Sequence, residues 1–358
     1  MIATKKIAAR AIAVCAAGLF VHTLALATIP VQHWTQTSGA QVYLVESPAI
    51  PMLDVQIDFD AGSRRDPPGQ IGLASMTADM GDKGVRASGE APALDENALG
   101  EAWADLGAQF GSGATADRMS FSLRSLTDPA LLDQAVALAA RQIAEPSYPE
   151  AVWMRERQRL QAALKESYTR PASVIGRAYA KAVYGQHPYG YEMTDATLAR
   201  ISVADLQAAH AAGVVACRAR ISMVGAVTRA QADALAARLL SRLPQVPCSS
   251  LPPLLAVPEV APLEKAEEIN IPFDSAQAHV LIGQPGFKRA DPDYFPLIVG
   301  NYILGGGGFV SRLTHEVREK RGLTYGVSSS FSPALHAGSF TVGLQTRPDQ
   351  TVQAVKIA

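Results

Sequence analysis

Cysteine is scarce in this chain of 358 residues, and its histidines are scattered. None of the three cysteines forms a CxxC pair, and no two of the seven histidines lie within one helical turn of each other. HExxH and HxxEH patterns are both absent. Because zinc sites need closely placed thiolate or imidazole ligands, the sequence offers no zinc framework of its own. Cys217 and Cys248 could form a disulfide in an oxidising compartment, although nothing in their spacing requires one.

Basic runs and long apolar segments are missing as well. The net charge is −1 and the isoelectric point about 6.7, with no stripe of lysine or arginine. This balance argues against nucleic acid as a partner. After the first residues, no segment is apolar over the ~20 residues that a membrane-spanning helix needs.

The first residues have the pattern of a secretory signal peptide. Lys5, Lys6 and Arg10 form a basic start, an apolar stretch runs to about Leu26, and a small-x-small cleavage site ends at Ala27. We therefore expect residues 1–27 to be removed and the mature protein to be periplasmic or secreted, without a membrane span. An uncleaved membrane anchor is the alternative.

The second half of the chain repeats the first. A strand-like segment at 54–58 and a helical segment at 69–80 have counterparts at 279–283 and 294–304. Four matches share one offset of 225 residues: Val55 with Val280, Ile57 with Ile282, Arg64 with Arg289, and Asp66-Pro67 with Asp291-Pro292. Strand-like segments at 119–126 and 338–344 extend the two copies. The repeat predicts an α+β fold of two homologous domains, each a mostly antiparallel sheet with helices packed on one face.

A proline-rich segment separates the two copies. Six prolines between Pro244 and Pro262 predict an extended, stiff linker at 244–265. It divides an N-terminal domain at 28–243 from a C-terminal domain at 266–358. The second copy stops at 351–355, inside its next expected helix, so by the logic of the repeat the second domain is truncated. We expect exposed apolar area and poor solubility as a result.

A glycine-rich segment precedes an amphipathic helix in the second copy. Gly305, Gly306, Gly307 and Gly308 allow close backbone approach and leave N–H groups exposed. No GK[ST] sequence follows, which disfavours a phosphate-binding loop. A flexible loop that faces a substrate is our interpretation, and a loose entry into the helix is the alternative.

The residues that follow carry a family resemblance. The string GGG-x-x-SRL-x-x-EVREKRGL-x-Y ends at Tyr325, and with it the chain resembles the insulinase/pitrilysin-like zinc peptidases over nearly the whole mature chain. The resemblance includes His187-Pro188-Tyr189-Gly190. It implies that Arg318 and Tyr325, seven residues apart, hold the backbone of a substrate and stabilise an oxyanion. Without it, they would be a solvated helix charge and a packed strand aromatic.

The first domain departs from the family pattern at the zinc motif. The family's inverted HxxEH helix supplies two zinc ligands and a general base. The corresponding positions here are Ser75 and Asp79 for the ligands and Ala78 for the base. Serine is a poor zinc ligand and alanine cannot accept a proton from water, so we expect neither metal nor cofactor at this helix.

The family's third ligand, a glutamate on a later helix, has two candidate positions. One count places it at Ala162 or Ala163, and another at Glu156. Neither choice restores a histidine to the site.

The resemblance therefore implies a non-catalytic subunit of a heterodimer whose zinc lies in the partner. Such a subunit would bind a peptide or unfolded polypeptide at a sheet edge, outside the cytoplasm. A zinc peptidase with unorthodox ligands and a structural scaffold subunit are the alternatives.

Overall fold

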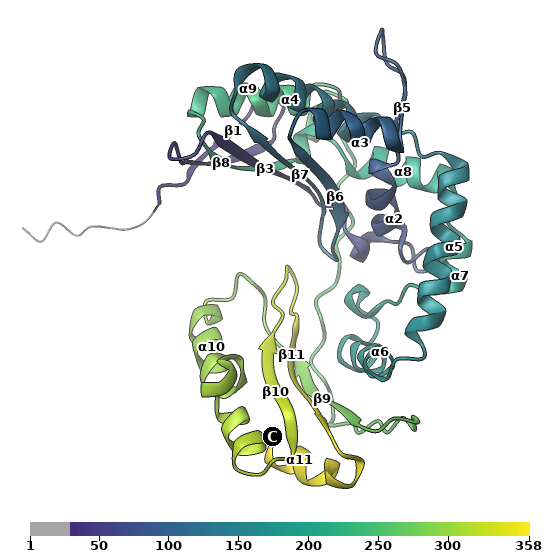
Figure 1. Ribbon diagram of the computed structural model, residues 1–358, viewed down its shortest axis with the longest axis vertical. Helices are drawn as coiled ribbons and strands as arrows, with labels where there is room; N and C mark the ends of the chain where they lie inside the picture. The colour runs from purple at the N-terminus through teal and green to yellow at the C-terminus, as the bar shows by residue number, and fades with distance from the viewer. Residues whose placement is uncertain (1–28) are drawn as a thin grey trace, which may run out of the picture.

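The computed structural model describes residues 29–358, so the predicted signal peptide lies outside the described residues. Two main sheets, each with helices packed against it, form an α+β fold (Figure 1), which confirms the predicted fold class. We call residues 29–243 the first lobe and residues 278–358 the second lobe. Among the helices of residues 29–358, none has the length and apolar character to cross a membrane.

The sheet of the first lobe has six strands in the order β1-β2-β8-β3-β7-β6. Their bounds are β1 Gln32–Thr35, β2 Gln41–Glu46, β3 Met52–Phe59, β6 Gln109–Ala114, β7 Met119–Leu126 and β8 Arg220–Gly225. Neighbours pair antiparallel except β2 and β8, which are parallel. Along β3 every second side chain is buried, from Leu53 to Phe59. This alternation gives the sheet one apolar face, and β6 ends the sheet on one side.

Helices cover that apolar face (Figure 1). They are α3 (Glu96–Asp105), α4 (Pro129–Ala144) and α9 (Arg229–Leu239), and their buried residues join those of the strands in one core. The sequence marks where two of them begin. The Asp95 carboxylate accepts hydrogen bonds from the first backbone N–H groups of α3, and Asp128 does the same for α4. A small ribbon of β4 (Gly84–Val85) and β5 (Leu94–Asp95) precedes α3.

A second apolar cluster holds α2 (Leu73–Asp79) beside β6. It packs α2 against α5 (Glu150–Ser167), α7 (Asp195–Ala199) and α8 (Val203–Gly213). Its buried members are Leu73, Met76, Met80, Tyr148, Trp153, Leu198, Ile201 and Leu206. The helix that carries the degenerate zinc motif is therefore held by apolar packing on both sides.

The sheet of the second lobe has the antiparallel order β10-β11-β9. Its strands are β9 Ala278–Pro285, β10 Thr324–Phe331 and β11 Ser339–Thr346, and its helical elements include α10 Tyr294–Asn301, η6 Tyr302–Gly306, η7 Gly308–Val310, η8 Thr314–Glu319 and α11 Thr351–Ile357. Its core is small: Leu313, Val317, Leu323, Val327, Val342, Leu344 and Ala354. Phe295, Val299 and Val310 are 71%, 62% and 78% exposed, so apolar surface remains open on this lobe.

An extended segment joins the lobes, and residues 251–277 contain neither helix nor strand. A disulfide between Cys217 and Cys248 attaches the start of this segment to the first lobe. Further along, Arg65 Nη1 donates to the carbonyl oxygen of Leu255 at 2.9 Å. At the second lobe, α6 (Pro171–Tyr184) packs on β9, and Tyr179 Oη donates to the carbonyl oxygen of Phe340 at 2.7 Å.

Replacing Cys248 with serine should lower the free energy of unfolding. The cross-link joins residues 31 apart, and closing a loop of that length restricts the unfolded chain by about 3 to 4 kcal/mol. Urea unfolding followed by circular dichroism measures the change. Ser249→Ala in the same turn is the matched control, and reduced wild-type protein should behave like Cys248→Ser. An unchanged urea midpoint would show that the disulfide does not stabilise the fold.

Candidate functional site

The carboxylate of Asp66 positions the start of α2. Its Oδ2 accepts from the Gly72 N–H at 2.9 Å, and its Oδ1 accepts from the Ala74 N–H at 3.0 Å. Gly72 has a φ of 108° and lies against Met193, whose Cε would be 2.8 Å from an added Cβ, so only glycine fits there. Burial raises the pKa of Asp66 to about 6, although the backbone N–H groups favour its charged form.

The three degenerate motif positions have different environments on α2. Ser75 and Asp79 lie one helical turn apart, with Ser75 partly buried and Asp79 at the surface, whereas Ala78 is buried. The Ala78 carbonyl oxygen accepts a hydrogen bond from Ser112 Oγ of β6 at 2.8 Å. This contact brings α2 directly beside the last strand of the sheet.

Two residues of α5, Glu156 and Arg159, act on Asp79 electrostatically, and Ala162 and Ala163 further along this helix are exposed. Burial raises the pKa of Asp79, and the carboxylates of Asp82 and Glu156 raise it further. The cations Arg159 and Lys83 oppose this shift. Glu156 thus influences Asp79, while the position of a third ligand stays a prediction.

Cations accompany these carboxylates. Arg159 Nε lies 2.7 Å from Glu156 Oε2. Within residues 29–358, no group of three or more histidine, cysteine, aspartate or glutamate side chains is placed to hold a metal ion. Two carboxylates, a serine and a guanidinium, without imidazole, do not fit the donor set that zinc takes in peptidases.

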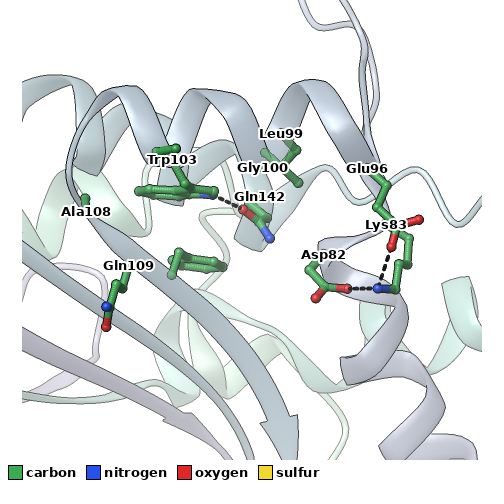
Figure 2. A pocket seen from close by; sticks show the side chains of 11 residues that line it. Asp82, Lys83, Glu96, Leu99, Gly100, Trp103, Ala108, Gln109 and Gln142 are labelled. Atoms are coloured by element: carbon green, nitrogen blue, oxygen red, sulfur yellow. Dashed lines mark hydrogen bonds and ion pairs between the residues drawn. The ribbon is translucent and has the colours of Figure 1, made fainter.

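A pocket of about 410 Å³ opens beside the first residues of β6 (Figure 2). Its floor is the stacked pair of Trp103 and Phe110, with ring centroids 5.2 Å apart, and Trp103 Nε1 donates to Gln142 Oε1 at 2.8 Å. Lys83 on its rim pairs with Glu96 at 2.8 Å and with Asp82 at 3.3 Å. An aromatic floor under a charge-paired rim suits a large apolar side chain. Local sequence patterns do not indicate this pocket, because its lining residues come from four separate segments.

Arg318 and Tyr325 come together where β10 begins. The guanidinium carbon of Arg318 lies 4.9 Å from the ring centroid of Tyr325 and 4.8 Å from that of Phe309. The neighbouring cations Lys320 and Arg321 instead pair with Glu316. Tyr325 is 86% exposed. Stacking between two rings restrains the guanidinium without neutralising its charge.

The two halves of the predicted site lie apart in this structure. The second lobe contacts the first where α6 packs on β9 and at the hairpin after β10, where the Leu335 N–H donates to Asp117. At ~3.3 Å per residue along a strand, Tyr325 lies ~20 Å from Phe331 at the hairpin end of β10. Arg318 and Tyr325 are therefore at the end of β10 that lies away from the hairpin contact.

The glycine-rich segment is packed rather than open. Gly305 and Gly306 end the π-helical turn η6, and a Cβ on Gly305 would lie 2.5 Å from the backbone nitrogen of Ser329. A Cβ on Gly307 would lie 2.6 Å from the carbonyl oxygen of Tyr302. Only Gly308, with a φ of 59°, has free space around it. Close packing thus explains the first three glycines. The segment is a packed turn and not the flexible loop expected from the sequence.

Comparison with known proteins gives consistent similarities. Residues 200–358 match the peptidase M16 inactive domain. The crystal structure of a peptidase M16 inactive domain from Pseudomonas fluorescens has a TM-score of 0.84 and 36% identity, over 91% of this chain and 77% of that one.

Two further relatives match in part. The periplasmic protease PqqL from Escherichia coli has a TM-score of 0.75 and 19% identity, over 92% of this chain but 36% of its own. An uncharacterized zinc protease of Streptomyces coelicolor is 47% identical over 81 residues, which is 23% of this chain and 17% of the relative's length.

Asp66→Asn should change how stability depends on pH. The pKa of Asp66 in the folded protein, about 6, lies above the ordinary aspartate pKa of 3.8. Folding therefore favours the protonated carboxyl. This group's contribution therefore falls as pH rises from about 4 to about 6, by about 3 kcal/mol in total. For buried histidines, the contribution to the free energy of unfolding changes with pH in the opposite direction. The measurement is therefore the difference in the free energy of urea unfolding between wild type and Asp66→Asn across this pH range. Parallel pH profiles for the two proteins would contradict the assignment.

Proposed function

Because the chain belongs to the insulinase-like zinc peptidases of the M16 family and lacks their zinc motif, we propose that it is a non-catalytic, substrate-binding subunit that works with a zinc-bearing relative. One observation carries the proposal. Arg318 and Tyr325 are both present and stacked, with Tyr325 exposed and Arg318 partly buried, while α2 holds Ser75, Ala78 and Asp79 at the metal positions. The chain thus keeps the residues that would contact substrate and lacks the residues that would hold the metal.

The sheet edge at β6 is the proposed peptide-binding surface. Within residues 29–358 this strand pairs only with β7, so its other edge has backbone groups available for an added strand. An added peptide would direct alternate side chains to the same side. A large apolar side chain near the start of β6 would then enter the pocket floored by Trp103 and Phe110.

Arg318 and Tyr325 would act on a substrate held by the partner. The guanidinium of Arg318 and the phenol hydroxyl of the exposed Tyr325 offer a positive charge and a hydrogen-bond donor, the groups that stabilise a developing oxyanion. In this structure they lie remote from α2 of the same chain. A site completed by a second subunit accounts for that separation, and the metal chemistry would belong to that subunit.

We place this activity outside the cytoplasm. The signal-like start of the sequence and the Cys217–Cys248 disulfide both support an oxidising compartment. The similarity to a periplasmic protease is consistent with it.

Co-expression with a zinc-bearing member of the family tests the proposal. In the complex, Arg318→Ala and Tyr325→Phe should each lower kcat on an unfolded peptide by about 100- to 1000-fold, as for the loss of one oxyanion donor. Arg321→Ala is the control, because Arg321 pairs with Glu316 on the same helix. Unchanged activity in both site variants would rule out this role.

Metal analysis of the purified chain alone separates the proposal from a peptidase with unorthodox ligands. We expect far less than one zinc per chain, because the donors near α2 are carboxylates accompanied by Arg159 and Lys83. Asp79→Ala is the matched variant. Stoichiometric zinc that is lost in Asp79→Ala would favour an enzyme in its own right.

A further inference from the structure

Polar side chains from several segments meet where the second lobe touches the first. Asp117, in the turn between β6 and β7, is the central acceptor. Its Oδ1 accepts from Tyr189 Oη at 2.6 Å, and its Oδ2 accepts from the Leu335 N–H at 3.0 Å. The Tyr189 hydroxyl also accepts from the His336 N–H at 3.2 Å. Two backbone N–H groups at the tip of the β10–β11 hairpin therefore donate hydrogen bonds to side chains of the first lobe.

His187 fixes the position of Tyr189. Its ring is buried, with 4% of the residue exposed. Nδ1 accepts from the backbone N–H of Tyr189 at 3.1 Å, and Nε2 lies 3.0 Å from the carbonyl oxygen of Pro258. An amide N–H only donates and a carbonyl only accepts. The two partners therefore assign a neutral ring with its proton on Nε2.

Charged and titratable groups surround His187 from each neighbouring segment. The ring of His336, on the hairpin, lies 5.2 Å away between centroids. Glu259, on the linker, lies 3.3 Å from His336 Nδ1 and pairs with Lys288 at 2.7 Å. On the first lobe, Arg64 Nη1 lies 3.4 Å from Asp117 Oδ1. The two nearby carboxylates are thus each accompanied by a cation.

The balance of these influences favours the neutral ring. Burial lowers the pKa of His187, and the nearby His336 lowers it further. The Pro258 carbonyl, Glu259 and Asp117 oppose this shift without reversing it.

We infer that neutral His187 keeps the β10–β11 hairpin bound to the first lobe and that acid releases the hairpin. We call this contact, formed by His187, Tyr189 and Asp117 with the hairpin tip, the latch. A proton on Nδ1 would face the Tyr189 N–H, so the hydrogen bond would be replaced by a repulsive contact. Tyr189 would then lose its fixed position, and its hydroxyl would no longer join Asp117 to the His336 N–H. The second lobe would keep its packing on α6, so the hairpin tip is the part released. This latch does not depend on the proposed peptide-binding role.

The direction of the pH effect follows from linkage. In the latched form the pKa of His187 is lowered, and a released hairpin that exposes the ring would move this pKa back toward its ordinary value. The latched form is therefore favoured at neutral pH. The released population should rise as pH falls through the ordinary titration range of histidine, by up to about tenfold per pH unit, until the latched ring itself is protonated.

Hydrogen–deuterium exchange of the full chain tests the latch. Protection of the peptide 332–339, corrected for intrinsic exchange, should fall about tenfold between pH 7.5 and pH 5.0. In His187→Gln the side-chain amide can make both hydrogen bonds but does not titrate, so protection should persist at both pH values. His336→Gln is the matched control and should keep the acid response. Tyr189→Phe, which keeps its backbone N–H, should lose protection already at pH 7.5.

Three results would overturn the inference. The first is equal protection of 332–339 at both pH values in the wild-type chain. The second is an acid-induced loss in His187→Gln as large as in wild type. The third is a parallel loss in the core peptides 52–59 and 119–126, which would show general unfolding instead of release of the hairpin.

Discussion

The buried carboxylate of Asp66 ties the N-terminus of α2 to the turn after β3, and the rest of the site depends on that attachment. Both carboxylate oxygens are used by backbone N–H groups of Gly72 and Ala74. With its start fixed and its sides packed on β6 and on α5, α7 and α8, α2 has a single position. Ser75, Ala78 and Asp79 are therefore held in fixed positions, and their side chains lack the imidazole groups of a zinc site.

Apolar packing and ion pairs provide the cohesion around α2. Metal ligation can join helices in zinc proteins and contribute to folding. Here the corresponding elements are joined by the apolar cluster around Trp153. Around the motif, Arg159 pairs with Glu156, and Arg155 bridges Glu156 and Glu96. These pairs are largely solvent-exposed, so the apolar cluster contributes most of the stability.

The proposed peptide-binding surface and the pair of Arg318 and Tyr325 lie on different lobes. The first offers an open sheet edge beside an aromatic pocket, and the second offers Arg318 held between Phe309 and Tyr325. Between them lies the contact centred on Asp117 and His187, which sets where the hairpin of the second lobe rests. A partner that completes the proposed site must fit both lobes. The lobes contact each other through the packing of α6 on β9 and the polar contact at the hairpin, and contacts between lobes change more easily than apolar cores.

The local pattern of the sequence determined much of this protein. Alternation of apolar residues predicts β3 and β7, the shared offset predicts the second sheet, and the motif around Arg318 and Tyr325 gives the family, because each signal lies within a few adjacent residues. The absence of HxxEH and HExxH excludes the zinc motif from the sequence alone, and the resemblance assigns Ser75, Ala78 and Asp79 to its positions. The sequence left open whether Glu156 or Ala162 and Ala163 lies near the motif, and it did not require the Cys217–Cys248 pairing.

Only the tertiary structure decided the Cys217–Cys248 pairing, together with the close packing of Gly305, the pocket over Trp103 and the neutral state of His187. Each depends on which distant residues meet and how deeply they are buried. Periodicity and spacing do not encode such contacts, since they arise from packing among segments far apart in the chain.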